Sequence, residues 1–157
     1  MFTLLVPFPA QATLKVFTCE PEWAALAKEL GGDRVEVTSA TQAMQDPHYI
    51  QARPSLIARV RKADLLVCTG AGLEAGWLPV LLRNGNNPRI LYGQPGHLMA
   101  SEHVMMKEIP LSVDRSMGDI HAGGNPHIQT DPRNIARVAG VLAERLKMLD
   151  SANRDEY

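Results

Sequence analysis

The sequence predicts an α/β fold, built as a four-stranded, mainly parallel sheet with helices on both faces. Three observations support this prediction. Strand-like runs alternate with helix-like segments, residues 64–69 (DLLVCT) form an almost continuous apolar run typical of a strand buried on both faces, and an amphipathic helix follows Asp131. The length of 157 residues fits one domain of common size.

The first predicted unit is a strand followed by a helix. Residues 14–18 (LKVFT) have the β-branched and aromatic content of a strand. Pro21 then opens a helix at a position where its missing N–H costs nothing, and Gly31 and Gly32 end it. The alternating residues 34–39 (RVEVTS) are expected to form the second strand.

The middle of the chain continues this alternation. We expect a second helix from Pro54 to Ala63, the buried strand at 64–69, a third helix at 73–82 and a fourth strand at 89–92 (RILY). Residues 93–126 are rich in Gly, Met and His and show no clear period. An irregular segment of this length in a compact domain usually serves a function.

The last predicted element is a long helix. Asp131 supplies its N-cap and Pro132 its first position. One apolar stripe runs along it, formed by Ile135, Val138, Ala139, Leu142, Leu146 and Leu149. Residues 150–157 (DSANRDEY) stop without a cap, as in a helix interrupted in mid-course.

Residues 1–12 (MFTLLVPFPAQA) are interpreted as the remnant of an export signal peptide. They are apolar and end in the small-x-small pattern of Ala10 and Ala12. The alternative is a buried first strand, which Pro7 and Pro9 disfavour because each removes a backbone donor. We therefore expect a periplasmic protein. Cys19 lacks the preceding small residue that lipid modification requires, so we expect no lipid anchor.

The composition argues against membrane and nucleic-acid partners. Hydrophobic content of 45% and charged content of 21% are ordinary for a soluble protein, and no apolar run reaches about 18 residues. The formal net charge of -1 arises from interspersed signs, so no nucleic-acid partner is expected. Cys19 and Cys68 could pair in an oxidising compartment, and they could also bind a soft metal; their spacing does not decide between these.

Two histidines preceded by proline are candidate metal ligands. His48 follows Asp46-Pro47, and His127 follows Asn125-Pro126. Loops at the carboxyl ends of parallel strands meet at one edge of a sheet, so distant histidines can converge there. Proline stiffens the approach to each imidazole, and neutral imidazole suits zinc, copper, iron and nickel. The alternative at each position is a solvated or capping histidine.

Several motifs, taken in order, resemble the substrate-binding proteins of zinc and manganese ABC importers, the ZnuA-like family. They span the chain from about Leu14 to its end: Asp46-Pro47-His48-Tyr49, Arg53-Pro54-Ser55, Ala63-Asp64-Leu65, Gly72-Leu73-Glu74 with Trp77, Gly124-Asn125-Pro126-His127 and Asp131-Pro132-Arg133-Asn134. The resemblance implies that residues 13–149 form the amino-terminal metal-binding lobe and that 150–157 lead toward a second lobe. It also implies that His48 and His127 bind zinc, with manganese as the other cargo, for delivery to an ABC permease in the inner membrane.

Three further residues are candidates near this site. His121 lies six positions before His127 in a glycine-rich loop and could reach the same ion, although a solvated histidine is the simpler interpretation. Asp119 is a possible ligand or acceptor beside a ligand. Glu74 is interpreted as a buried hydrogen-bonding group near the site, while His97 and His103 are expected to be surface residues of the irregular stretch.

Three classes of function follow from these residues. The first is a binding protein that captures a metal ion without chemistry. The second is a zinc hydrolase that uses His48, His127 and a carboxylate, with an open metal position for water. The absence of a helical His-Glu-x-x-His motif weighs against it. The third is a structural domain in which the histidines are incidental.

Overall fold

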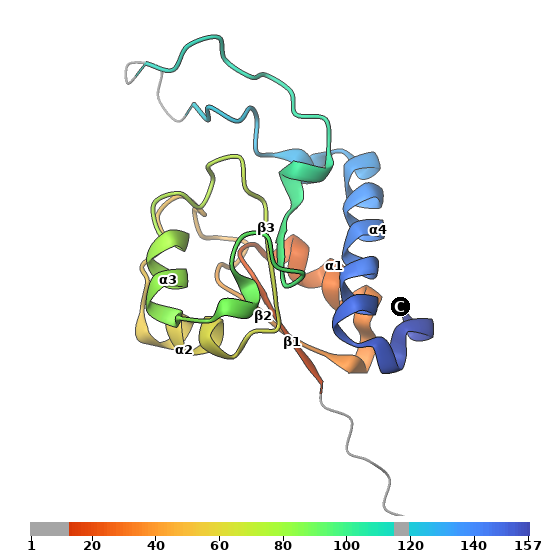
Figure 1. The fold of residues 1–157 in the computed structure, drawn as a ribbon. Coiled ribbons are helices and arrows are strands. Elements are labelled where there is room, and N and C mark those ends of the chain that lie inside the picture. Colours follow the sequence, from red (N-terminus) through yellow and green to blue (C-terminus); the bar gives the residue numbers. More distant parts are fainter. Residues whose placement is uncertain (1–12, 115–119) are drawn as a thin grey trace, which may run out of the picture.

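The computed structural model describes residues 13–114 and 120–157, which form a parallel sheet between two layers of helices (Figure 1). The expected signal-peptide remnant at 1–12 and the candidate Asp119 lie outside the described residues.

The sheet has four strands in the order β2-β1-β3-β4, and all neighbours pair in parallel. The strands are β1 (Leu14–Thr18), β2 (Val35–Ser39), β3 (Leu65–Cys68) and β4 (His97–Met99). All four residues of β3 are buried, as the apolar run predicted. The predicted α/β class and parallel four-stranded sheet are therefore confirmed.

Helices cover both faces of the sheet. On one face lie α1 (Pro21–Gly31) and α4 (Pro132–Leu149), whose Trp23, Val138, Leu142 and Leu146 pack against Val16, Leu65 and Val67. On the other lie α2 (Pro54–Lys62) and α3 (Leu78–Gly85), whose Leu56, Val60 and Leu81 pack against Phe17 and Leu66. Successive residues of a strand point to opposite faces of the sheet, so a continuous apolar strand contributes side chains to the hydrophobic core on each face.

The third helix begins later than predicted. The sequence indicated a helix at 73–82, but α3 starts at Leu78 and the chain from Ala71 to Trp77 forms turns. Pro79 explains the shift, because proline fits the first turn of a helix but would remove an internal hydrogen bond from a helix that began at residue 73. Gly72, with a φ of 92°, also departs from helical geometry.

The fourth strand is not at 89–92, as predicted, but at His97–Met99. Pro88–Ile90 instead form a short 3₁₀ helix, because Pro88 cannot donate to a sheet and the Asn87 side chain accepts from the backbone N–H of Arg89. Ile90 is fully buried. This strand lies within residues 93–126, which we expected to be irregular. Because the strand is only three residues long, its sequence shows no recognisable alternation.

The carboxyl-terminal segment turns back onto the domain. α4 ends at Leu149, and Ser151–Glu156 form a 3₁₀ helix. A guanidinium nitrogen of Arg34 donates to Asn153 Oδ1 at 2.6 Å, and the Tyr157 hydroxyl donates to Asp150 at 2.8 Å. These contacts hold a segment that we expected to continue away from the lobe. Among the described residues, no helix combines the length and the apolar run needed to cross a bilayer.

Candidate metal centre

The candidate site lies at the carboxyl edge of the sheet, where segments from two distant parts of the chain meet. His48 comes from the loop that connects β2 to α2. His121 and His127 come from residues 120–127, the returning part of an arm whose outgoing part is residues 104–114 and which leads back to α4 (Figure 1). The two halves of the arm are joined where the Asn125 backbone N–H donates to the Lys107 carbonyl at 2.8 Å.

Two imidazoles meet at this edge. The Nε2 atoms of His48 and His121 are 3.0 Å apart, and the rings are nearly parallel, with centroids 5.1 Å apart. A tetrahedral ion with two bonds of about 2.0–2.1 Å would separate two such nitrogens by about 3.3 Å. The observed spacing is therefore close to that of two ligands on one ion.

His127 belongs to the same cavity but is more exposed. The cavity has a volume of about 460 Å³ and is lined by His48, Glu108, Pro110, Ile120, His121, Gly124, Asn125, Pro126 and His127. His127 begins the short 3₁₀ helix Ile128–Thr130, and its backbone N–H donates to the Asn125 side chain at 2.9 Å. The three histidines named from the sequence thus face one cavity, with Glu108 as the nearby carboxylate.

Asp46 orients the His48 ring, a role that we did not assign from the sequence. Its Oδ1 accepts from the His48 backbone N–H at 2.9 Å and lies 2.6 Å from Nδ1 of the same ring. Both contacts lower the pKa of Asp46, and the hydrogen bond from the His48 backbone has the larger effect. The carboxylate therefore stays charged. With its proton on Nδ1, His48 presents a free electron pair on Nε2 toward His121. An Asp two residues before a histidine is the signal that could have revealed this Asx turn.

Glu74 is buried and does not line the cavity of the histidine cluster. It is 3% exposed, and its carboxylate accepts backbone hydrogen bonds from Thr69 at 2.8 Å and from Gly70 at 3.1 Å. Glu20, also 3% exposed, accepts from the same Thr69 N–H and from the Thr69 hydroxyl. Burial, followed by the charge of Glu74, raises the pKa of Glu20 to about 9, so the pair holds a proton at neutral pH.

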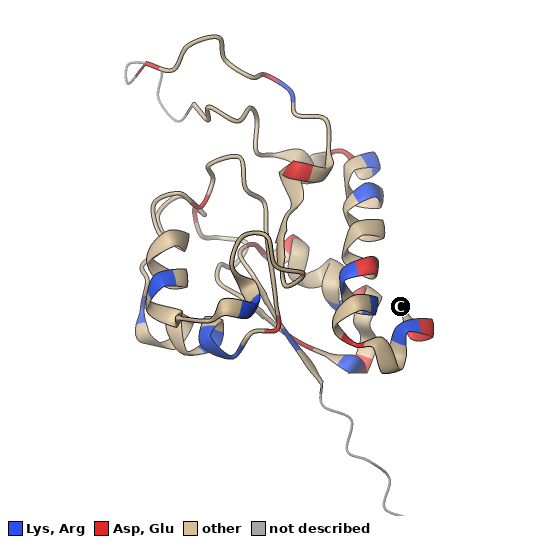
Figure 2. Cartoon of the chain, in the orientation of Figure 1, with Lys and Arg blue, Asp and Glu red and all other residues tan. Residues whose placement is uncertain are grey.

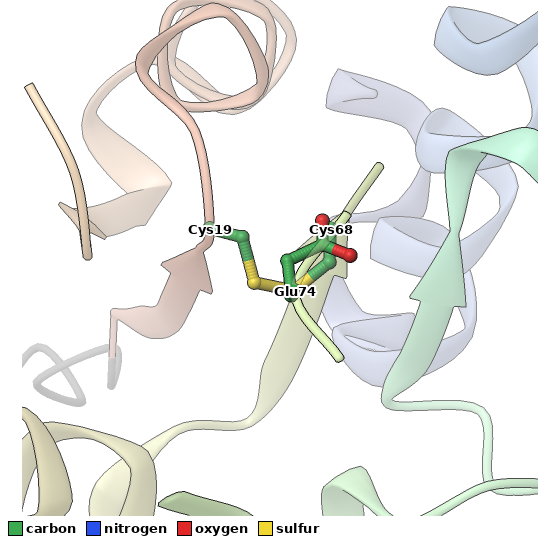
Figure 3. A group of neighbouring side chains, drawn as sticks. All are labelled: Cys19, Cys68 and Glu74. Atoms are coloured by element: carbon green, nitrogen blue, oxygen red, sulfur yellow. A yellow bond between two sulfur atoms is a disulfide. The ribbon is translucent and has the colours of Figure 1, made fainter. Parts of the chain in front are cut away.

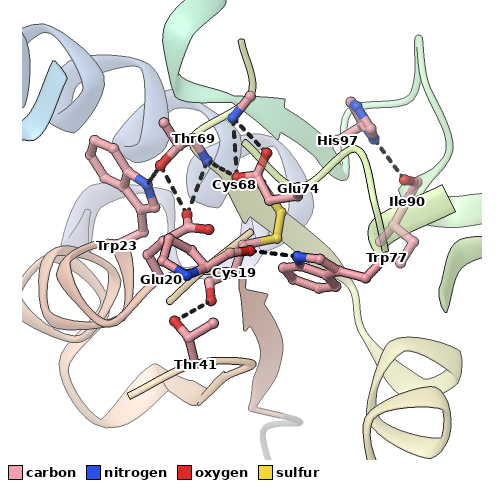
Figure 4. The surroundings of a disulfide bond; sticks show 12 residues. Cys19, Glu20, Trp23, Thr41, Cys68, Thr69, Glu74, Trp77, Ile90 and His97 are labelled. Carbon is pink, nitrogen blue, oxygen red and sulfur yellow. Dashed lines mark hydrogen bonds between the residues drawn. A yellow bond between two sulfur atoms is a disulfide. The ribbon is translucent and has the colours of Figure 1, made fainter. Parts of the chain in front are cut away.

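Cys19 and Cys68 form a disulfide next to this pair of carboxyl groups (Figures 3 and 4). Donor atoms of Cys19, Cys68 and Glu74 lie within 4.8 Å of one another. Since the thiolate is the form that binds metal, the disulfide withdraws both sulfur atoms from coordination. The sequence left open whether the two cysteines form a disulfide or bind a soft metal, and in the structure they form a disulfide.

The remaining histidines lie apart from the cluster. His97 is in β4, where its Nδ1 contacts the Ile90 carbonyl at 2.9 Å and its ring meets Tyr92 edge-on. His103 ends a short 3₁₀ helix and does not line the cavity of His48.

The fold and the sequence both match known metal-binding proteins. Over 92% of this chain and 50% of the other, the structure is similar to the crystal structure of ZnuA, with a TM-score of 0.72 and 25% identity. A zinc-bound ZnuA deletion mutant has a TM-score of 0.74 at 26% identity over the same shares of the two chains. A Mn-bound periplasmic metal-binding protein from Candidatus Liberibacter asiaticus, 18% identical over 92% and 49% of the two chains, has the same fold, with a TM-score of 0.72.

Relatives found by sequence are named as metal transport components. The manganese ABC transporter substrate-binding lipoprotein PsaA of Streptococcus pneumoniae is 28% identical over 92% of this chain and 44% of its own length. FimA of Streptococcus parasanguinis, a metal ABC transporter substrate-binding lipoprotein, is 28% identical over 94% and 46%. The chain therefore spans about half the length of these relatives. They are named as lipoproteins, which differs from the absence of a lipid anchor that we expected from the sequence.

The decisive match is to a family profile. The profile of ZnuA, described as zinc-uptake complex component A, periplasmic, matches residues 16–157. It includes the last three residues of β1, the loop of His48, the turn of Glu74 and the segment that carries His121 and His127. The chain belongs to the ZnuA family.

Proposed function

We propose that this chain binds a divalent transition-metal ion, zinc in preference to manganese, through His48, His121 and His127. The observation that supports the proposal most directly is the 3.0 Å approach of two imidazole nitrogens from loops 73 residues apart. Without a metal, the same spacing fits an N–H···N hydrogen bond in which His121 donates to His48. A metal ion at this position would need the other tautomer of His121, with its proton on Nδ1 and the electron pair of Nε2 facing the ion.

The choice of zinc follows from the chemistry of the donors. Three imidazoles suit zinc, whereas manganese prefers carboxylate, carbonyl and water oxygens. The relatives include a protein named for manganese as well as the zinc-bound ZnuA structure, so the family alone does not select one metal. Glu108, which lines the cavity, is the carboxylate that would favour manganese if it joined the histidines.

The proposed role is transport rather than catalysis. We infer that the ion is captured outside the cytoplasm, in the periplasm, and is passed to the permease of an ABC importer. Family membership and the names of the relatives support a binding component and not the zinc hydrolase considered from the sequence. Glu74, the carboxylate considered as a hydrolytic base, is buried in hydrogen bonds to Thr69 and Gly70.

Zinc titration of four single variants tests the site. We expect His48→Ala, His121→Ala and His127→Ala each to weaken zinc binding in competition with a chromogenic chelator. From the sequence His121 was expected to matter less, but its contact with His48 supports treating it as a ligand equal to the other two. His103→Ala is the matched control, because this histidine lies outside the cavity, and its zinc affinity should equal that of the wild type. Unchanged affinity in both His48→Ala and His121→Ala would refute the proposal.

The transport role needs a separate test in cells. Expression of the chain in a zinc-importer-deficient strain, followed by growth under zinc limitation, measures delivery. Growth rescue that disappears in His48→Ala would support delivery through this site. Rescue that is equally strong in His48→Ala would contradict it.

A further inference from the structure

One segment, Thr69–Trp77, contacts the loops of both His48 and His121. At one end, a Cβ placed on Gly72 would lie 3.4 Å from His121 Nδ1, so the backbone passes directly beneath that ring. Gly123 packs on the same turn, because a Cβ there would lie 3.1 Å from the Cα of Ala71. The loop of His121 therefore rests on residues 71 and 72.

The other end of the segment holds the loop of His48. The indole N–H of Trp77 donates to the Pro47 carbonyl at 2.7 Å (Figure 4), and the Trp77 side chain is almost fully buried. A Cβ on Gly76 would lie 3.4 Å from the His48 carbonyl oxygen. Since the segment contacts both loops, its shape sets the distance between the two imidazoles.

The shape of this segment depends on Glu74. Gly70, Ala71 and Gly72 have φ values of 81°, 55° and 92°, which is a conformation that an alanine rarely adopts. The Glu74 carboxylate accepts the backbone N–H groups of Thr69 and Gly70, the two donors that enter this turn (Figure 4). It lies beside the Cys19–Cys68 disulfide, which joins the ends of β1 and β3 under the turn (Figure 3).

We propose that Glu74 is a positioning residue of the metal site, and that it acts through the Thr69–Trp77 segment. It does not touch the ion. It keeps residues 70–72 in the conformation on which His121 rests, so that both imidazoles are in place before a metal arrives. The inference rests on the proposed function, since it concerns the same histidines. Groups that orient ligands without binding the metal typically contribute about 10–100-fold to affinity.

The test compares two substitutions of Glu74 with a matched control. Glu74→Ala removes the acceptor of two backbone N–H groups, whereas Glu74→Gln keeps the oxygen that accepts both of them. The control is Asn87→Ala, which removes the buried hydrogen bonds to the Val60 and Ala63 carbonyls and the acceptor of the Arg89 backbone N–H, but in the layer of α2 and α3. Zinc affinity, the melting temperature without metal and the visible spectrum of bound Co²⁺ are measured for each.

We expect Glu74→Ala and Asn87→Ala both to lower the melting temperature. Only Glu74→Ala should also weaken zinc binding, by about 10–100-fold, and alter the Co²⁺ spectrum. Glu74→Gln should retain most of the affinity. If Glu74→Ala does not fold, Trp77→Phe tests the other end of the segment, because it removes the hydrogen bond to Pro47 together with part of the buried ring system. Weaker zinc binding in that variant supports the inference, and unchanged binding overturns it.

The outcomes separate this inference from the proposed function. If His48→Ala loses zinc binding but a folded Glu74→Ala binds as tightly as the wild type, Glu74 is not a positioning residue and the metal site stands. If Asn87→Ala loses as much affinity as Glu74→Ala, the effect follows general destabilisation and the inference is overturned. If neither His48→Ala nor His121→Ala weakens zinc binding, both proposals are wrong.

Discussion

The buried pair Glu20 and Glu74 predicts that the folded protein loses stability as pH rises. Burial and the neighbouring charge of Glu74 raise the pKa of Glu20 from about 4.5 to about 9. Glu20 Oε1 is buried without a hydrogen-bond partner among the described residues, so an ionised Glu20 would carry unsatisfied charge. Burial also raises the pKa of Glu74, and the pair therefore keeps one proton that the unfolded chain has lost.

The sign and size of the effect follow from proton linkage. The folded state binds one more proton than the unfolded state between about pH 4.5 and about pH 9. The stabilisation is fully present below this window and is lost as pH rises through it. One proton corresponds to about 1.4 kcal/mol per pH unit, so the free energy of unfolding should fall by roughly 3 kcal/mol between about pH 6 and about pH 8.

Glu20→Gln tests this directly. The amide cannot ionise, yet its oxygen can accept from Thr69 and its NH₂ group can donate to Glu74. Urea unfolding of both proteins without metal, at several pH values between about 6 and 8, measures the two slopes. Groups distant from residue 20 are the same in both proteins, so their contributions cancel in the difference. Equal slopes for wild type and Glu20→Gln would show that the pair does not retain its proton.

Three further predictions concern the site and the core. Asp46→Ala should weaken zinc binding by about 10–100-fold, because His48 loses the acceptor that orients its ring; chelator competition measures it, and unchanged affinity would contradict it. Replacing both Cys19 and Cys68 by alanine should lower the free energy of urea unfolding by about 4 kcal/mol, since the disulfide closes a separation of 49 residues. Leu142→Ala, fully buried on α4, should cost about 2–5 kcal/mol in the same assay without weakening zinc binding; full stability would contradict the packing.

Elements with a local start signal were predicted well from the sequence. Pro21, Pro54 and Pro132 each stand at the beginning of a helix, and the structure starts α1, α2 and α4 at these residues. The Asp131 side chain accepts from the backbone N–H of Arg133, as an N-cap should. A proline at the first helical position acts through its own backbone, so the signal does not depend on the rest of the fold.

Elements decided by tertiary packing were predicted less well. Residues 89–92 have the composition of a strand, but Ile90 is buried in the core as part of a 3₁₀ helix. The fourth strand, β4, is formed instead by His97–Met99. A close backbone approach allows this, because a Cβ on Gly96 would lie 2.5 Å from the Arg89 and Asp64 carbonyl oxygens. Whether a short apolar segment becomes a strand depends on the strands and helices that pack against it. The residues of the segment alone do not reveal those contacts.

In the candidate site, too, some features could be predicted from the local sequence and others depend on tertiary contacts. His48 and His127 could be named from proline-histidine loops, because a proline beside a histidine is a local feature and parallel strands bring such loops to one edge. The contact of His48 with His121 depends on the left-handed turn at residues 70–72, and Ala71 in that turn gives no sign of a positive φ. Such a conformation persists only where surrounding contacts impose it, here the Glu74 carboxylate and the packing of Gly123. The candidate ligands can therefore be recognised from the residues next to them, whereas their spacing, on the inference above, depends on the segment Thr69–Trp77, which is distant from them in sequence.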